Sequence, residues 1–161
     1  TEGFQTPTGK VELYSHVLDR YGLDPLPHFE LPIESIERAP EIAQQYPLIL
    51  NAGRRVAVYN HSSHRTLPRL RKKEPEPFAE IHPITAQVYD IHDGDWVIVE
   101  SPRGKIEVKS KVTRDIVPGV VGPVHGWAQA NANILTDHKN CDPILGTPSV
   151  RASLCAVRRK E

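Results

Sequence analysis

The sequence predicts a small, mainly β protein built as a closed barrel. Short apolar runs separated by turn residues recur after residue 45, and few segments have helical periodicity. The chain contains 15 prolines, scattered along its length, and because proline interrupts helices, none of the helices can be long. With 161 residues, the chain is long enough for one domain with its own core.

Residues 1–45 differ in pattern from the rest, and we expect them to form a linker or peripheral segment. A short helix is predicted over 16–21, with Ser15 as its N-cap and Gly22 after its end. Prolines are then frequent as far as Pro40, which indicates an extended, irregular connector.

The barrel domain is expected over residues 46–161, and its strands can be assigned in order. The apolar run 48–50 predicts a buried strand behind a proline. Residues 96–112 predict a β-hairpin around a proline–glycine turn at 101–104. The remaining expected elements are strands at 120–121 and 154–157 and one helix that begins at Pro83 and continues to Tyr89.

Composition excludes several classes of protein. Lys plus Arg and Asp plus Glu both total 20, and the resulting net charge of zero argues against a nucleic-acid binder or a polybasic membrane binder. No apolar run approaches the roughly 18 residues that span a bilayer. The complete absence of methionine predicts that the chain has been processed or was cut from a longer protein. Cys141 and Cys155 permit one disulfide or two thiols, so the compartment stays open.

Motifs for catalysis and metal binding are missing. The sequence has no P-loop, no G-x-G-x-x-G, no nucleophile elbow and no C-x-x-C. Among eight histidines, His61 and His64 have a ligand-like spacing, but a metal site would also need His82 or His92. Histidines that form hydrogen bonds in polar loops explain the pattern better, so we assign no catalytic residue and no metal ligand to this chain.

A basic run lies between the first strand and the predicted helix. Its members are Arg65, Arg69, Arg71, Lys72 and Lys73, and acidic residues follow directly, up to Glu80. A solvated loop is the default interpretation of such a run. Contact with an anion or with another part of a larger protein is the functional alternative. The run lacks interleaved aromatic residues, which disfavours single-stranded nucleic acid as a ligand.

Two segments are suited to binding a phosphorylated heterocycle. Ala52-Gly53-Arg54 follows an apolar strand, where a glycine allows close approach of the backbone and an arginine offers a planar fork to phosphate. His125-Gly126-Trp127 combines an imidazole with an indole donor. Asn133 follows in a polar stretch, and its amide matches the edge of a purine or pterin. A core or rim position for Trp127 and a turn or capping role for Asn133 are the structural alternatives.

A series of short motifs runs along the chain in a fixed order. They are residues 3–15, Ala52-Gly53-Arg54, Tyr59-Asn60-His61-Ser62, Ile81-His82-Pro83, residues 93–97, residues 101–104, His125-Gly126-Trp127, residues 133–136, residues 141–144 and Leu154-Cys155. In this order they resemble the C-terminal part of the molybdopterin oxidoreductases of the dimethyl sulfoxide reductase family. The resemblance covers essentially the whole chain, most firmly 46–157.

The resemblance implies a six-stranded double-psi β-barrel with a few short flanking helices. It also implies that this domain binds one of two molybdopterin guanine dinucleotides that hold molybdenum or tungsten. The residues that would contact the cofactor are Ala52, Gly53, Arg54, His61, Ser62, His125, Trp127, Asn133 and Arg151. Ala52 stands where many family members have threonine, and Arg55 is an additional arginine.

The resemblance further implies that the ligand of the metal and any iron–sulfur cluster lie in earlier domains. The expected partners are therefore those domains and an iron–sulfur electron-transfer subunit, and the isolated chain is expected to be inactive. A free-standing interaction module that docks on a partner protein is the alternative, and a small barrel enzyme is a third reading. A long upstream coding region with a cluster motif would favour the oxidoreductase. Substrate, metal and compartment do not follow from this sequence.

Overall fold

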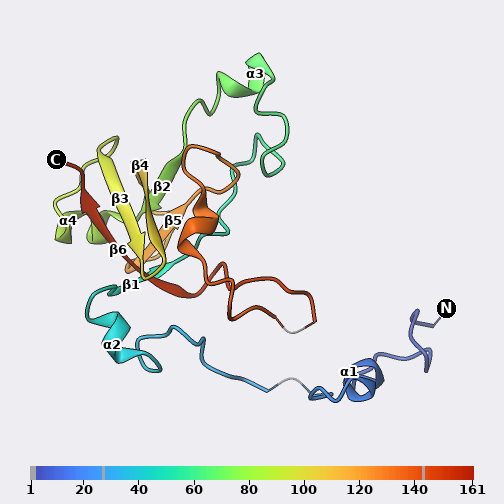
Figure 1. Cartoon of the computed structure of the whole chain (residues 1–161). Coiled ribbons are helices and arrows are strands. Elements are labelled where there is room, and N and C mark those ends of the chain that lie inside the picture. The colour runs from blue at the N-terminus through green and yellow to red at the C-terminus, as the bar shows by residue number, and fades with distance from the viewer. Residues whose placement is uncertain (1–2, 27, 143) are drawn as a thin grey trace. The chain divides into compact units, whose positions relative to one another are not determined.

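The computed structural model describes residues 3–26, 28–142 and 144–161. The chain divides into two compact units, Thr1–Leu31 and Pro32–Glu161. Among the described residues, none of the helices has the length and apolar character needed to cross a membrane. The elements in chain order (Figure 1) are α1 (His16–Arg20), α2 (Pro40–Ala43), β1 (Leu48–Leu50), α3 (Pro68–Arg71), β2 (Phe78–Ile81), α4 (Pro83–Val88), β3 (Trp96–Ser101), β4 (Gly104–Val112), β5 (Val120–Pro123), the 3-10 helix η1 (Ala132–Leu135) and β6 (Ser153–Arg159).

The first unit contains α1, which confirms the helix predicted from the sequence. The Ser15 hydroxyl accepts a hydrogen bond from the Leu18 amide at 3.3 Å, as an N-cap should. Gly22 follows with φ of +68°, a left-handed conformation that ends the helix without a Cβ clash. No residue of α1 is buried, and Leu13 and Phe29 are also largely exposed. The described residues of this unit therefore form no apolar core around α1.

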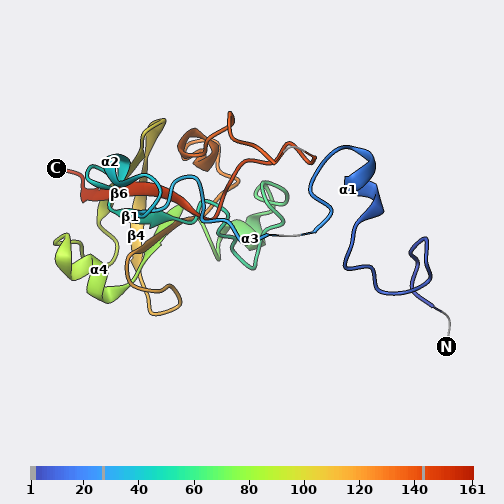
Figure 2. The ribbon, with the colours of Figure 1, turned by 90° about the horizontal axis from the view of Figure 1, so that it is seen from below.

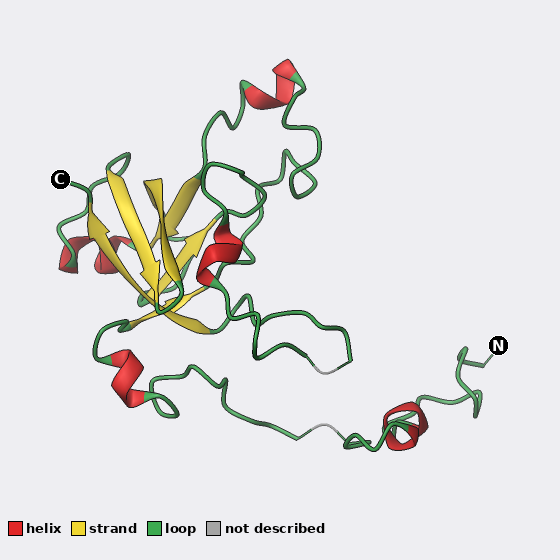
Figure 3. Ribbon diagram, in the orientation of Figure 1, coloured by secondary structure: helices red, strands yellow, loops and turns green. Residues whose placement is uncertain are grey.

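The second unit is a closed barrel of six strands with short helices at its periphery (Figure 3). Its strands are hydrogen-bonded in the order β1-β5-β2-β4-β3-β6. Two neighbouring pairs are parallel, β1 with β5 and β2 with β4, and the other four pairs are antiparallel. Closure removes the exposed strand edges that an open sheet would leave.

The strand order makes this a double-psi barrel. The connection from β1 to β2 passes over β5, which lies between them, and the connection from β4 to β5 passes over β2 in the same way. Exchanging β1 with β4, β2 with β5 and β3 with β6 reproduces every pairing and its direction. Two interlocked halves with the same topology therefore build the barrel, and the predicted fold class is confirmed.

Most strands coincide with the apolar runs that predicted them. β1, the β3–β4 hairpin, β5 and β6 all overlap predicted segments, and α4 begins at Pro83 as expected. The side chains that fill the barrel are almost wholly buried; the largest of them are Leu50, Ile81, Val97, Val99, Val108, Val121 and Val124.

Four elements were not predicted: α2, α3, β2 and η1. α3 lies within the basic run that we interpreted as a loop. β2 lies in the segment that we interpreted as a solvated loop, and that interpretation is wrong for Glu80, which is buried in the strand. α2 lies at the end of the segment expected to be irregular, with Pro40 at its first position, where a missing N–H costs nothing.

The segment before β1 is attached to the barrel by an ion pair. Glu34 contacts the guanidinium of Arg103, and their side chains are only 11% and 18% exposed. The Glu34 carboxylate also accepts from the Leu154 amide of β6 at 3.1 Å. Arg103 in turn donates to the Leu135 carbonyl at the end of η1, through Nε at 3.1 Å and Nη2 at 3.0 Å.

Candidate functional site

The strand pairing brings three loops to one edge of the barrel. β1 and β5 are parallel neighbours, so the loops that follow them leave at the same edge. β6 is antiparallel to β1, with Ser153 opposite Leu50, so the segment that enters β6 reaches this edge too. Figure 2 shows β1 and β6 side by side. We therefore expect residues 51–55, 124–127 and 147–152 to lie close enough together to form one binding site.

Backbone hydrogen bonds join these three loops. The Gly53 amide donates to the Val150 carbonyl at 3.0 Å, and the His125 amide donates to the Arg54 carbonyl at 3.1 Å. A Cβ on Gly53 would lie 3.3 Å from Cγ2 of Val150, tighter than most contacts of this kind. Glycine at this position thus allows the loop after β1 to lie close to the segment before β6.

A pocket of about 490 Å³ opens where the loops meet. It is lined by Ala52, Gly53, Arg55, His61, His125, Asn133, Thr147, Pro148, Val150 and Arg151. Six of the nine residues predicted to bind the cofactor are in this lining, and none of the described residues that line it carries a carboxylate. Neither Arg55 nor Arg151 forms an ion pair with a described residue, so both guanidinium groups are free to receive an anion.

The other three predicted residues lie beside the pocket lining. Ser62 is exposed, next to His61. Trp127 is buried, with 7% of its surface exposed, and packs in the core, the alternative that we had considered for it. The Nε of Arg54 is engaged by the carboxylate of Glu80, whose side chain is 8% exposed. Arg54 thereby neutralises a buried charge, and its carbonyl binds His125.

Two histidines form a hydrogen-bonded pair at the pocket wall. Nε2 of His125 lies 2.7 Å from Nδ1 of His61, and Nδ1 of His125 lies 2.9 Å from the Arg54 carbonyl. A carbonyl can only accept, so Nδ1 of His125 carries a proton. In the neutral pair, Nε2 of His125 must then accept from the N–H of His61 at Nδ1. Nε2 of His61 is left with a lone pair, as a hydrogen-bond acceptor.

The surroundings of His125 favour its neutral form. Burial lowers the pKa of His125, and the hydrogen bond to the Arg54 carbonyl works in the opposite direction. Interactions with His61, Arg55 and Arg65 lower the pKa further. The surroundings of His125 therefore favour its neutral form near neutral pH.

Arg65, the first member of the basic run, is not a solvated residue as we had interpreted it. Its guanidinium carbon lies 3.9 Å from the centre of the Trp127 ring and 4.3 Å from that of Tyr59. Both distances are typical of cation–π contacts. Burial lowers the pKa of Arg65, and the interaction with Tyr59 opposes this. The solvated interpretation holds for the rest of the run, whose members Arg69, Arg71, Lys72 and Lys73 are exposed.

Asn133 enters the pocket lining from η1. The cap of this helix is Asn131, whose side chain accepts from the Asn133 amide at 3.1 Å. The capping alternative that we considered for Asn133 is therefore wrong. The Asn133 side chain makes no hydrogen bond to a described residue, so its donors and acceptor are available to a ligand.

The histidines singled out as metal-ligand candidates do not converge. His82 caps α4, where its Nδ1 accepts from the Ile84 amide at 3.1 Å. His92 lines a different pocket from His61. The described residues include no group of three or more His, Cys, Asp or Glu side chains placed to hold a metal ion. Cys141 and Cys155 are both free thiols, which resolves the alternative that the sequence left open.

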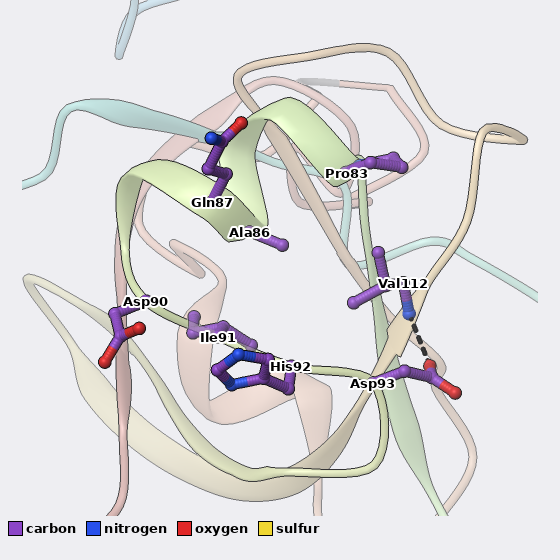
Figure 4. Close-up of a pocket in the computed structure, with 8 residues that line it drawn as sticks. All are labelled: Pro83, Ala86, Gln87, Asp90, Ile91, His92, Asp93 and Val112. Carbon is purple, nitrogen blue, oxygen red and sulfur yellow. Dashed lines mark hydrogen bonds between the residues drawn. The ribbon is translucent and has the colours of Figure 1, made fainter.

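A second pocket, of about 380 Å³, lies at the opposite edge of the barrel. It opens between α4 and the end of β4, because β2 and β4 are parallel and both end there. Figure 4 shows that the carboxylates of Asp90 and Asp93 lie on different sides of it. Asp93 is already occupied by the Val112 amide, at 2.8 Å. No convergent set of polar groups makes this pocket a chemical site.

Comparison with known proteins identifies relatives over nearly the whole chain. A family described as "Molydopterin dinucleotide binding domain" matches residues 48–154. Acetylene hydratase of Syntrophotalea acetylenica is 36% identical over 98% of the chain, and dopamine dehydroxylase of Eggerthella lenta is 37% identical over 93%. The solved structure of acetylene hydratase from Pelobacter acetylenicus superposes with a TM-score of 0.87 over 99% of the chain, at 32% identity.

These relatives are much longer proteins. The chain spans 24% of the acetylene hydratase of Syntrophotalea acetylenica and 16% of the dopamine dehydroxylase. It covers the same share, 24%, of the superposed acetylene hydratase structure.

Proposed function

Because the chain belongs to the Molydopterin dinucleotide binding domain family, which matches residues 48–154, we propose that it holds one molybdopterin guanine dinucleotide. The chain would do so as part of a longer molybdenum or tungsten oxidoreductase of the dimethyl sulfoxide reductase family. When bound, the pterin and its metal supply the redox chemistry. The residues of this chain bind the dinucleotide and orient it.

The observation that carries the proposal is the charge of the pocket at the β1–β5 edge. Arg55 and Arg151 line this pocket, and its described lining contains no carboxylate. A dinucleotide carries a pyrophosphate, and charge-assisted hydrogen bonds from guanidinium groups are among the strongest that a protein can offer it. The close approach of the backbone at Gly53 leaves this loop free of a bulky side chain beside the anion.

The polar edge of the pocket suits a heterocycle. Asn133 offers two donors and an acceptor, and a pterin or guanine presents both kinds of group on its edge. His61 adds an acceptor at Nε2 when the histidine pair is neutral. Both side chains line the same pocket as the two arginines, so a single ligand could contact all of them.

We assign the nine residues of the predicted site different tasks. Direct contact is proposed for Ala52, Gly53, His61, His125, Asn133 and Arg151, with Arg55 added to them. Arg54 and Trp127 would act from behind the pocket wall, and Ser62 from its exposed position next to His61. For Arg54, the contact with Glu80 supports this role, because a guanidinium held by a buried carboxylate is a weaker phosphate ligand.

The remaining parts of the proposal concern the longer protein. The ligand of the metal would come from other domains, which are the partners that this barrel contacts, and an iron–sulfur subunit would deliver electrons. The isolated chain would have no redox activity. Turnover by the purified 161 residues, supplied with metal and electron donor, would contradict this.

The test compares arginine variants in the full-length protein. Arg55→Ala and Arg151→Ala should each weaken retention of the dinucleotide by roughly tenfold to a hundredfold, since a hydrogen bond to a charged group contributes about 1.5–3 kcal/mol. Arg69→Ala is the matched control, because Arg69 is an exposed arginine outside the pocket. The guanine nucleotide released by acid from purified protein gives the cofactor content.

Asn133→Leu extends the test to the heterocycle, and it should also lower the guanine nucleotide content. Thermal unfolding of each variant would separate loss of the ligand from loss of the fold. Wild-type cofactor content in both arginine variants would refute the pocket as the binding site. It would leave a protein-docking barrel as the better interpretation.

A further inference from the structure

The guanidinium of Arg65 connects the loop after β1 to the loop after β5. Its Nη2 donates to the His61 carbonyl at 3.0 Å and to the His125 carbonyl at 2.9 Å. These two residues are 64 positions apart, and they are the same two whose imidazoles are hydrogen-bonded. One nitrogen atom of Arg65 therefore fixes both backbones of the histidine pair.

Aromatic contacts hold Arg65 in place. Its guanidinium contacts the rings of Trp127 and Tyr59, and these two rings pack edge to face with their centres 6.0 Å apart. Tyr59 is itself fixed, because its hydroxyl donates to the Glu74 carbonyl at 2.7 Å. Nε and Nη1 of Arg65 are buried without a hydrogen-bond partner among the described residues. The stack and the two carbonyls thus account for all the contacts found for this guanidinium.

The backbone at the contact is unusually constrained. His61 has a φ of +54°, a left-handed backbone conformation that residues other than glycine seldom adopt. A Cβ on Gly126 would lie 2.7 Å from the carbonyl carbon and oxygen of His61, so the two loops touch where only glycine fits. A conformation of this kind persists only where surrounding contacts enforce it. The bond from Arg65 to the His61 carbonyl is such a contact.

We propose that Arg65 is a positioning residue that sets the hydrogen bond between the His61 and His125 rings and so fixes which nitrogen of His61 is left free. The hydrogen bond orients the His61 ring, with Nδ1 toward His125 and Nε2 left as the acceptor. Without the two bonds from Arg65, the His61 backbone would be released, and the ring would sample other orientations and tautomers.

Lysine cannot replace arginine in this role. An ammonium group has the same charge, but it lacks the planar guanidinium surface that contacts the rings of Trp127 and Tyr59, and this contact holds Nη2 against the two carbonyls. Arg65→Lys therefore keeps the positive charge but removes the contacts that position the two histidines. Arg69→Lys is the matched control, since Arg69 is an exposed arginine of α3.

The test is nitrogen NMR of the full chain at about pH 8, where histidines of ordinary pKa are neutral. In the wild type we expect a scalar coupling across the bond between His61 Nδ1 and His125 Nε2, with the proton of His61 on Nδ1. Arg65→Lys should abolish this coupling and give a mixture of His61 tautomers, with the strand amide resonances unchanged. Arg69→Lys should leave the coupling as in the wild type.

Two results would overturn the proposal. One is a folded Arg65→Lys variant that keeps the coupling and the single His61 tautomer. The other comes from the wild type alone and decides the case even where the variant does not fold. The Nη protons of Arg65 should exchange with water much more slowly than those of Arg69. Equal exchange rates would show that Arg65 does not form lasting hydrogen bonds to the His61 and His125 carbonyls.

Discussion

Replacing Glu34 by alanine should destabilise the barrel, although Glu34 lies outside all six strands. Its carboxylate contacts the Arg103 guanidinium and accepts from the Leu154 amide. Removing one partner of a buried ion pair costs about 3–5 kcal/mol, because the other charge stays desolvated. Arg103 keeps its bonds to the Leu135 carbonyl, so we place the loss at the lower end, about 3 kcal/mol.

The magnitude can be read from thermal unfolding followed by circular dichroism. For a chain of this length, 1 kcal/mol lowers the melting temperature by about 2–4 °C, so Glu34→Ala should lower it by about 6–12 °C. Glu37→Ala is the matched control. Glu37 is an exposed glutamate of the same segment, and its loss should change the free energy of unfolding by no more than about 0.5 kcal/mol.

A double-mutant cycle isolates the ion pair from the remaining contacts. Arg103→Met alone leaves the Glu34 carboxylate with only the Leu154 amide, and the double variant removes both charges together. The double variant should therefore lose less stability than the sum of the single variants, by about 0.5–3 kcal/mol. Strict additivity, or a Glu34→Ala melting temperature equal to that of Glu37→Ala, would refute the reasoning.

Three further predictions concern single side chains. Gly126→Ala should lower the free energy of unfolding in urea by more than Gly146→Ala does. Both variants place alanine in a left-handed conformation, which costs about 1–2 kcal/mol, but of the two only Gly126 would bring the new Cβ against backbone atoms. Equal losses in the two variants would contradict this. Burial lowers the pKa of His125, so its contribution to stability is complete above about pH 6.5 and is lost as the pH falls through the lowered pKa. The free energy of unfolding should therefore fall less between pH 7.5 and pH 5 in His125→Asn than in the wild type, as measured by urea unfolding. Burial also raises the pKa of the Cys155 thiol, so a thiol reagent should label Cys141 in the folded protein and Cys155 only after unfolding.

The sequence predicts the elements whose signals are local. β1, β5 and the β3–β4 hairpin are apolar runs bounded by proline or glycine, and these residues act on the chain next to them. β2 is different, because Glu80 interrupts its apolar run. Burial of that glutamate depends on Arg54, 26 residues earlier, which no local pattern reveals.

The sequence identifies the residues of the candidate site that lie in its short motifs, but not how those motifs meet. Six predicted residues meet in one pocket because β1 and β5 are parallel neighbours, a pairing that the individual strands do not specify. Arg65 was missed for a related reason. Its two aromatic partners are 6 and 62 positions away, and only the closed barrel brings Trp127 to Tyr59.

The neutrality of the whole chain is compatible with an anionic ligand because its charges are separated in space. The buried acids Glu34 and Glu80 are each paired with an arginine that holds a loop, Arg103 and Arg54. These pairs cancel in the net charge and contribute little field at the pocket. Arg55 and Arg151 have no such partner among the described residues and line the pocket without a carboxylate. A net charge of zero argues against a broad basic surface, but it is compatible with a locally positive pocket for one anionic ligand.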